Sequence, residues 1–549
     1  MALNRDQGST NLSEQRQTIY FDCFAAIGRR AAKDPRAPWS TAALLAEMER
    51  CQVHGALVFA HQARETHPAV GNPLVTEECR RHPRLFPCWV GIPHHTGEFP
   101  PPEQLVRAME AANVRALKIF PRLFEFRVDE ATLGPLLSCL EEAGILLIVD
   151  AGRYDEAVQI DWQEVNWICS RFPRLNLLLH SVRWESTRTL VPLAQRHPNL
   201  YFEFSNYQGN RMLEFWCEVI GHERLLFGSE ALVKSMGAAR AYVDYAELTE
   251  AQRRAIASGN LQRLLRLPSL PPPYPTKPKQ EDHVLQCALR GEAVRDSVVI
   301  DAHAHIVQAA GKGASRVAMN RADAQAVVER NRRLGVAKTC VSAWTAVWGD
   351  YVLGNQDTLQ AMRAFPEEIV GYAVLDPNYV TDWERECRFY HLECRFLGMK
   401  PYYPRQKVPY NDPLFTPWYR FGDEHRLFCL LHYSDKFKEE VSDIAPRYPN
   451  IAFILAHSGT SWKVAREHVA LAKQFPNVFL EITFTSVTNG VIEFMLEELG
   501  SERVLYGSDA PMRDPYPQFG WVAYADLPEE DKRNILGRNM QRILDRVAL

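Results

Sequence analysis

The sequence lacks a CxxC pair and any long run of a single charge. Its 12 cysteines are scattered, and several lie inside apolar segments, such as Cys88 in 85–92 and Cys429 in 427–432. This spacing predicts reduced, buried thiols and argues against a disulfide framework or a cysteine zinc site. The formal net charge is −4 and no basic stripe stands out, so we expect no nucleic-acid partner.

Long hydrophobic runs are also missing. No uninterrupted apolar stretch is long enough to span a bilayer. The segment 1–17 is polar where a secretory signal peptide would need an apolar core. We therefore expect a cytoplasmic protein that has no membrane partner and acts on a small molecule.

The sequence has the composition of an ordinary globular protein, and one proline-rich segment interrupts it. Apolar residues make up 46% and charged residues 24% of 549 residues, which is too long a chain for one core. The run LPSLPPPYPTKPKQ at 267–280 contains six prolines, which exclude a helix or a central strand. We predict a domain at 1–266, a proline-rich linker with a connecting helix at 267–296, and a second domain at 297–549.

Both halves show the same alternation of short apolar, β-rich segments with helix-length segments. Eight strands, each followed by a helix, are typical of a parallel barrel whose strands are covered on both faces. The sequence thus predicts an α/β fold of two tandem (β/α)8 TIM-type barrels. The expected strands begin near 18, 55, 85, 114, 145, 175, 200 and 224, and again near 298, 338, 369, 396, 427, 451, 477 and 503.

The two halves also repeat one another in register. Both end on similar words, GNLQRLL at 259–265 and GRNMQRIL at 537–544. Such steady spacing indicates a tandem duplication of one barrel. The matched positions are 279 residues apart for Asp22 and Asp301, 282 for Lys118 and Lys400, 277 for His180 and His457, 278 for Glu203 and Glu481, and 279 for Glu230 and Asp509.

Polar residues follow the expected strands of the second half, where the reactive groups of a parallel barrel converge. Imidazoles and a carboxylate form a borderline ligand set that suits Zn, Mn, Fe or Co. Such an ion lowers the pKa of a bound water, and a nearby histidine can move the proton. The residues are His303 and His305 in the word IDAHAHI, then Lys400, His432, His457 and Asp509.

The ordered words DAHAH, GMKP, LLHYS, AHSG, YGSDAP and GRNMQRIL resemble the amidohydrolase superfamily. The resemblance covers 298–544. More narrowly, this segment resembles the amidohydrolase-related branch of the superfamily, which contains aminocarboxymuconate semialdehyde decarboxylase. It implies that His457 and Asp509 are catalytic and that relatives form dimers, so a monomer or a homodimer is expected. It further implies one divalent metal, zinc before manganese, iron or cobalt, held by His303, His305, His432 and Asp509.

Lys400 has a second interpretation, because some superfamily members carboxylate this lysine to bridge two metals. We favour one metal and place Lys400 among the groups that face the substrate. Arginine suits a planar carboxylate and aromatic rings suit a flat substrate, which favours an aromatic or unsaturated carboxylic acid. Alternatively, these residues close the barrel mouth or contact the other half; they are Lys400, Tyr402, Arg405, Trp344 and Arg513. Glu481, repeated as Glu203, is left off the catalytic set as a structural carboxylate.

The first half has lost the metal motif. Aligning FDCFAAI with IDAHAHI places Phe24 and Ala26 at the two histidine positions, and Asp150 replaces the strand 5 histidine. Neither Phe nor Ala can coordinate an ion, so we expect a degenerate barrel retained for packing, stability or lid-forming contacts. The alternative is a mouth that still binds a ligand through Lys118, Asp150, His180 and Glu230.

The leading functional hypothesis is a metal-dependent hydrolase that uses metal-activated water, with a histidine as general acid or base. The same site also fits a non-oxidative decarboxylase, in which the metal grips substrate oxygens and a proton is delivered to carbon. A third hypothesis is a non-catalytic tandem barrel that serves as a binding or scaffold protein. The complete residue set in the second half argues against this third hypothesis.

Overall fold

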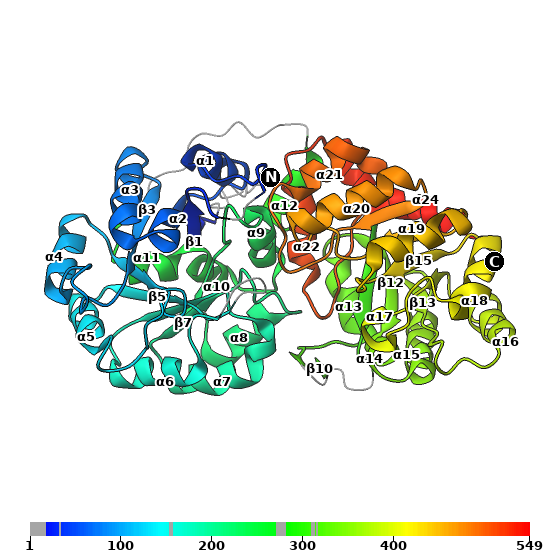
Figure 1. Cartoon of the computed structure of the whole chain (residues 1–549), viewed down its shortest axis with the longest axis horizontal. Helices are drawn as coiled ribbons and strands as arrows, with labels where there is room; N and C mark the ends of the chain where they lie inside the picture. Colours follow the sequence, from blue (N-terminus) through cyan, green and yellow to red (C-terminus); the bar gives the residue numbers. More distant parts are fainter. Residues whose placement is uncertain (1–17, 32–33, 153–157, 271–281, 309–312, 315–316) are drawn as a thin grey trace, which may run out of the picture.

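The computed structural model describes residues 18–31, 34–152, 158–270, 282–308, 313–314 and 317–549. The chain forms two lobes that lie side by side, the N-terminal half in blue to green and the C-terminal half in green to red (Figure 1). Each lobe is built on an eight-stranded sheet. The predicted pair of tandem (β/α)8 barrels is therefore confirmed.

The first barrel runs in simple sequence order from β1 to β8, and all neighbouring pairs are parallel. Backbone bonds from Cys23 N to Phe227 O (2.9 Å) and from Ala26 N to Ala231 O (2.8 Å) join its first and last strands. The strands are β1 (Phe21–Ile27), β2 (Gly55–Ala60), β3 (Leu85–Gly91), β4 (Ala116–Ile119), β5 (Leu146–Asp150), β6 (Leu177–His180), β7 (Leu200–Glu203) and β8 (Leu225–Leu226). The helices are α1 (Thr41–Arg50), α2 (His61–Glu65), α3 (Pro68–Arg81), α4 (Pro102–Ala111), α5 (Gly134–Ala143), α6 (Trp162–Arg171), α7 (Thr187–Arg196), α8 (Met212–Ile220), α9 (Met236–Tyr245), α10 (Glu250–Arg254) and α11 (Asn260–Leu264).

The second barrel repeats this plan after α12 (His283–Arg290). Backbone bonds from Ala302 N to Tyr506 O (3.0 Å) and from His305 N to Ala510 O (2.5 Å) join its first and last strands. Its strands are β9 (Val299–Ile306), β12 (Val336–Ala343), β13 (Ile369–Ala373), β14 (Gly398–Met399), β15 (Phe428–Leu431), β16 (Ala452–Leu455), β17 (Val478–Glu481) and β18 (Val504–Leu505), and a small hairpin pairs β10 (Gly313–Ala314) with β11 (Val317–Ala318). Its helices are α13 (Ala324–Arg332), α14 (Trp344–Trp348), α15 (Tyr351–Ala364), α16 (Trp383–Cys387), α17 (Tyr403–Gln406), α18 (Thr416–Glu424), α19 (Phe437–Arg447), α20 (Trp462–Gln474), α21 (Val491–Leu499), α22 (Pro515–Ala523), α23 (Glu529–Arg533) and α24 (Asn539–Asp545).

The strands form where the apolar, β-rich segments predict them, because strands covered on both faces must be apolar throughout. The 12 cysteines are free thiols and most are buried, as their scattered spacing predicts. Residues 271–281 of the predicted linker lie outside the described residues. No helix in the described part of the chain is long and apolar enough to cross a membrane.

Helices α9 and α22 pack against each other between the two lobes. Each follows the last strand of its own barrel, and every residue of α22 is buried. Glycines allow the close approach, because a Cβ added at Gly520 would lie 2.4 Å from the Cβ of Ala241, and one at Gly237 would lie 2.1 Å from the Cβ of Tyr524. The same helix from each copy forms the contact, as in an isologous interface between two subunits.

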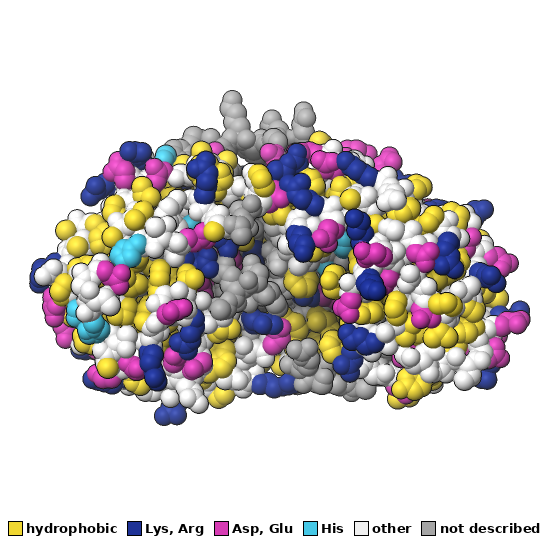
Figure 2. Space-filling view, viewed as in Figure 1, with side chains coloured by type: hydrophobic (Ala, Val, Ile, Leu, Met, Phe, Trp, Pro, Cys, Tyr) yellow, Lys and Arg dark blue, Asp and Glu magenta, His cyan; other side chains and the backbone are white. Residues whose placement is uncertain are grey.

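Charged side chains of both signs are mixed over the face of the two lobes seen in Figure 2. This distribution agrees with the formal net charge of −4. It offers no broad basic surface on this face for nucleic acid.

Candidate metal centre

Strand β9 places His303 and His305 on the same side of the sheet, because side chains two residues apart in a strand share a face. Both rings are buried. Asp509 follows β18 with φ 56° and His457 follows β16 with φ 62°. Left-handed backbone is uncommon for residues other than glycine, and it often occurs at functional sites. The counterpart Glu230 in the first barrel keeps φ 59°.

The predicted ligands converge around His303. Its ring shares one cluster with His305 and Asp509 and another with His432 and His457, and within each cluster the possible ligand atoms lie within 4.8 Å of one another. Nε2 of His305 lies 3.3 Å from Oδ1 of Asp509, and Nε2 of His303 lies 3.8 Å from the same oxygen. The geometry thus brings together every residue in the predicted metal set and adds His457 within reach.

The imidazoles are held by partners at their outer nitrogens. Nδ1 of His303 lies 3.0 Å from Glu481, Nδ1 of His305 lies 3.0 Å from the Ser342 carbonyl, and Nδ1 of His457 lies 2.8 Å from the Thr483 carbonyl. Such contacts fix the tautomer and leave Nε2 with its lone pair. Nδ1 of His432 is buried and makes no hydrogen bond within the described residues. An orphaned imidazole nitrogen beside three other nitrogen and oxygen donors fits a divalent ion.

Electrostatics keep these rings neutral, as metal coordination requires. Burial, and then the nearby Lys400, lower the pKa values of His303, His305 and His432 well below the ordinary value. Burial, followed by Arg513, lowers the pKa of His457 to about 3. Burial also lowers the pKa of Lys400 itself well below its usual range, and its Nζ lies 3.1 Å from Nε2 of His303.

Glu481, which the sequence reasoning left out, belongs to this centre. Its carboxylate contacts His303 and accepts the backbone N–H groups of His457 (3.2 Å) and Thr483 (2.6 Å). Burial raises its pKa to about 7. The signal that could have found it is the repeat, because the first-barrel Glu203 also accepts a backbone N–H, from Ser181 at 2.7 Å.

The residues predicted to face the substrate lie at different depths. The Trp344 ring meets the His305 ring edge-on at 5.9 Å, and the Tyr402 ring meets that of His432 at 4.8 Å. Arg513 is buried and donates to the Asp509 carboxylate and to Oγ1 of Thr485 (2.6 Å). Arg405 is exposed and contacts Trp348, which stacks on Trp344. It therefore lies farther out than the other four.

The first barrel fills the corresponding space with a ring and an ion pair. Phe24 stacks on His180 with ring centroids 4.0 Å apart. Nζ of Lys118 lies 2.8 Å from Asp150 and 3.1 Å from Nδ1 of His180. Among the described residues of this barrel, no group of histidines, cysteines and carboxylates is arranged to hold a metal.

A cavity of about 220 Å³ opens beside the first barrel's mouth. Ala26, Trp39 and His61 of the first barrel line it together with Trp462 and Thr488 of the second. None of the predicted metal ligands borders this cavity. This cavity and the ligand cluster are therefore separate features of the molecule.

Solved structures that are similar to this chain each match about half of it. A 2,6-dihydroxybenzoate decarboxylase from Rhizobium is 15% identical, covering 46% of this chain and 99% of its own, with a TM-score of 0.36. A 4-oxalomesaconate hydratase from Rhodopseudomonas palustris is 15% identical, covering 45% and 96%, with a TM-score of 0.35. A 5-carboxyvanillate decarboxylase from Novosphingobium aromaticivorans, complexed with manganese and a nitrobenzoic acid, is 12% identical, covering 46% and 99%, with a TM-score of 0.36.

No curated protein matches the chain. A family model described as Amidohydrolase matches it twice, over residues 24–267 and 300–546. These two segments coincide with the two barrels and account for most of the sequence. The chain therefore belongs to the amidohydrolase family and carries the family's domain in two tandem copies.

Proposed function

We propose that the second barrel is a metal-dependent hydrolase of a small organic acid, with an aromatic or unsaturated carboxylic acid as the substrate class. The observation that carries this proposal is the convergence of His305, Asp509, His432 and His457 around the buried His303. Isolated core histidines would each need a satisfied partner of their own. Here their inner nitrogens face one another instead.

His303, His305, His432 and Asp509 are the proposed ligands of one divalent ion, with zinc before manganese, iron or cobalt. When bound, such an ion supplies a Lewis acid that polarises a substrate oxygen and makes water a better nucleophile near neutral pH. The neutral histidine rings, and the outer nitrogens of His303 and His305 that are fixed by hydrogen bonds, prepare the residues for this role.

His457 is the proposed proton carrier. Nδ1 donates its N–H to the Thr483 carbonyl at 2.8 Å, so Nε2 keeps a free lone pair. This nitrogen takes a proton from the attacking water and returns it to the leaving group. Burial lowers the pKa of this ring, so His457 stays neutral before the reaction and Nε2 is available as the base.

The proposed substrate contacts come from Arg513, Tyr402 and Trp344. Lys400 adds a polar group beside them. Arg513 offers a guanidinium to a carboxylate, while its bonds to Asp509 and Thr485 hold it in place. The two aromatic rings pack edge-on to the histidines and suit a flat substrate body. Arg405 lies at the outer edge, where it can contact only an extended substrate.

Metal analysis and a product assay test the proposal together. Protein purified without chelator should hold about one ion per chain, and a His303→Ala, His305→Ala double variant should hold almost none. The control is His425→Ala, because that side chain is partly exposed and its ring hydrogen-bonds only to the Ala548 carbonyl among the described residues. Absence of metal from the wild-type protein would revive the scaffold hypothesis.

The product assay uses a panel of aromatic and unsaturated carboxylic acids in ¹⁸O-labelled water. A hydrolase incorporates ¹⁸O into its organic product, whereas release of carbon dioxide with no ¹⁸O in the organic product would replace hydrolysis with decarboxylation. His457→Asn should reduce turnover by about 100-fold or more, the usual contribution of a proton-transfer group. Full activity in this variant would remove His457 as the proton carrier.

A further inference from the structure

A single loop of the second barrel carries two groups of the proposed metal centre into the contact with the first barrel. Asp509 and Arg513 face each other at the centre through an ion pair. The next residue, Asp514, is fully buried and caps helix α22 through the backbone N–H of Tyr516 (3.1 Å). The loop 509–514 therefore has the centre at one end and the barrel interface at the other.

Backbone groups of the first barrel form hydrogen bonds with the interface end of this loop. Asp514 donates its N–H to the Gln208 carbonyl at 2.7 Å, and its Oδ2 accepts the N–H of Arg211 at 3.0 Å. The duplication repeats the first contact in reverse, because Ser235 of the first barrel donates its N–H to the Val487 carbonyl of the second at 3.0 Å. Each barrel thus holds the loop after the last strand of the other.

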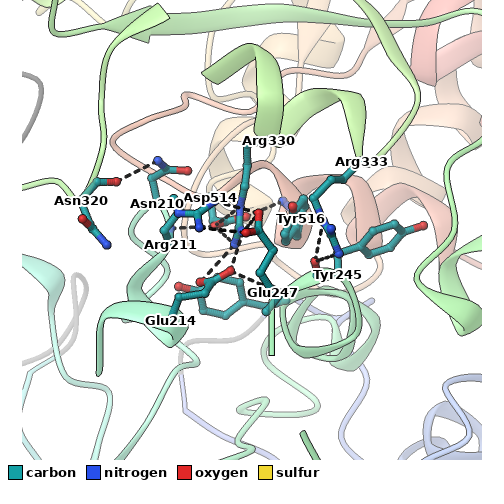
Figure 3. Close-up of polar contacts among 12 residues, drawn as sticks. Asn210, Arg211, Glu214, Tyr245, Glu247, Asn320, Arg330, Arg333, Asp514 and Tyr516 are labelled. Carbon is teal, nitrogen blue, oxygen red and sulfur yellow. Dashed lines mark hydrogen bonds and ion pairs between the residues drawn. The ribbon is translucent and has the colours of Figure 1, made fainter. Parts of the chain in front are cut away.

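Arg330 joins the same carboxylate to a side chain of the first barrel (Figure 3). Its Nε and Nη2 lie 3.0 and 2.6 Å from Oδ2 of Asp514, while its Nη1 lies 2.5 Å from Oε1 of Glu214. Arg330 is 1% exposed, and its guanidinium lies 3.9 Å from the centre of the Tyr516 ring. A planar guanidinium fixes the direction of both carboxylates, which a flexible ammonium would not.

The charges of this cluster depend on one another. Burial alone would raise the pKa of Glu214, but Arg330 holds it below its usual value. Burial raises the pKa of Asp514 although Arg330 opposes this shift. Removing the Glu214 charge therefore changes the balance around Arg330, whose other strong contact is the loop. Buried ionic groups of this kind are sensitive to loss of one partner.

We propose that the first barrel positions loop 509–514 of the second barrel. Glu214 acts through Arg330 on Asp514, and Asp514 in turn positions Asp509 and Arg513. Glu214 is a positioning residue, since it lies on α8 of the first barrel and acts on the metal ligand only through the chain of contacts. The inference rests on the proposed function for its effect on metal affinity, but the order of the loop can be measured without any metal.

The test compares Glu214→Gln with Asp34→Asn in the full-length chain. Asp34 makes the matched control, because its carboxylate also bridges the barrels, to Arg466 at 2.7 and 2.8 Å, and has no contact with loop 509–514 among the described residues. Metal is removed with a chelator and Mn²⁺ is titrated back. We expect Glu214→Gln to bind Mn²⁺ about 10-fold more weakly, in the range found for residues that support metal ligands, and Asp34→Asn to match the wild type.

Hydrogen exchange of the metal-free proteins gives the second readout. Peptides that cover 509–515 should exchange faster in Glu214→Gln than in Asp34→Asn and the wild type. If Glu214→Gln does not fold, Arg330→Lys replaces it, since lysine keeps the positive charge but lacks the planar guanidinium that contacts both carboxylates. Unchanged exchange in the folded variant would overturn the inference. If the wild type binds no Mn²⁺ while the loop still loosens, only the proposed metal centre fails.

Discussion

Glu481 shows how one carboxylate can organise several groups at the metal centre. It contacts Nδ1 of His303 and accepts the backbone N–H of His457. It therefore sets the ring of a proposed ligand and the backbone of the proposed proton carrier at the same time. The corresponding Glu203 makes similar backbone contacts in a barrel without the metal histidines. The acid is thus required by the backbone of the fold, and the second barrel also uses it to orient a ligand.

Replacing Glu481 with alanine should lower the affinity for Mn²⁺ or Zn²⁺ by about 10- to 100-fold, because His303 loses the partner that fixes its tautomer. Isothermal titration of the metal-free protein measures this change. Glu203→Ala is the matched control, since it removes the equivalent carboxylate from the barrel whose described residues form no metal-binding cluster. Equal metal affinity in both variants would show that Glu481 serves the backbone alone.

At the scale of elements, the contact between α9 and α22 depends on glycines. Gly520 faces Ala241 and the Gly237 carbonyl, at 2.4 and 2.7 Å from the position of an added Cβ. Two helices can approach this closely only where one side chain is absent. Neither the repeat nor the apolar pattern of the sequence revealed this pairing, because a helix buried on all sides reads as any core helix.

Gly520→Val should reduce the free energy of unfolding by about 1–3 kcal/mol through overpacking of the helix pair. Urea denaturation followed by tryptophan fluorescence measures the change. Gly259→Ala is the control, because it lies in helical backbone with φ −59°, and its added Cβ would approach only the Arg254 carbonyl, at 3.5 Å. The control should be neutral or slightly stabilising. A neutral Gly520→Val would mean that the helices can separate without cost.

The sequence predicted the two repeated barrels but missed the contacts that join one barrel to the other. Apolar segments and matched spacings locate both sheets, and the residues at strand ends predict the cluster around His303. Arg330, Glu214 and Asp514 carry no such signal, since each is an ordinary charged residue until the two barrels are placed together. Arg405 illustrates the same limit, because its position after β14 does not show that it stays at the surface.

At the scale of the whole molecule, the two barrels share one core. A single hydrophobic cluster includes residues of both, and the Tyr245 ring packs against those of Tyr516 and Phe519 at 5.3 and 5.6 Å. The buried cluster of Glu214, Arg330 and Asp514 lies in the same interface. Neither barrel can expose this surface without losing apolar contacts and leaving charges unpaired.

We therefore expect the metal-loaded chain to unfold in one thermal transition. Differential scanning calorimetry should give a single peak whose calorimetric enthalpy equals the van't Hoff enthalpy. Removing the metal should shift that peak to lower temperature, because a bound ligand stabilises only the native state. Two separate peaks, with only one responding to metal, would show that the barrels unfold independently.

The filled mouth of the first barrel has an evolutionary consequence. Phe24 and Asp150 stand where the second barrel has His303 and His432, and they pack or pair with His180 and Lys118, so a histidine placed at either position alone would break contacts without creating a ligand set. Natural selection would have to pass through several unfavourable intermediates to recover a second reaction centre. By contrast, the loop after the last strand of each barrel contacts the other barrel, so both copies of this loop are needed for the interface. A change at the mouth of the first barrel therefore disturbs only contacts within that barrel, whereas a change in an interface loop also disturbs the neighbouring barrel.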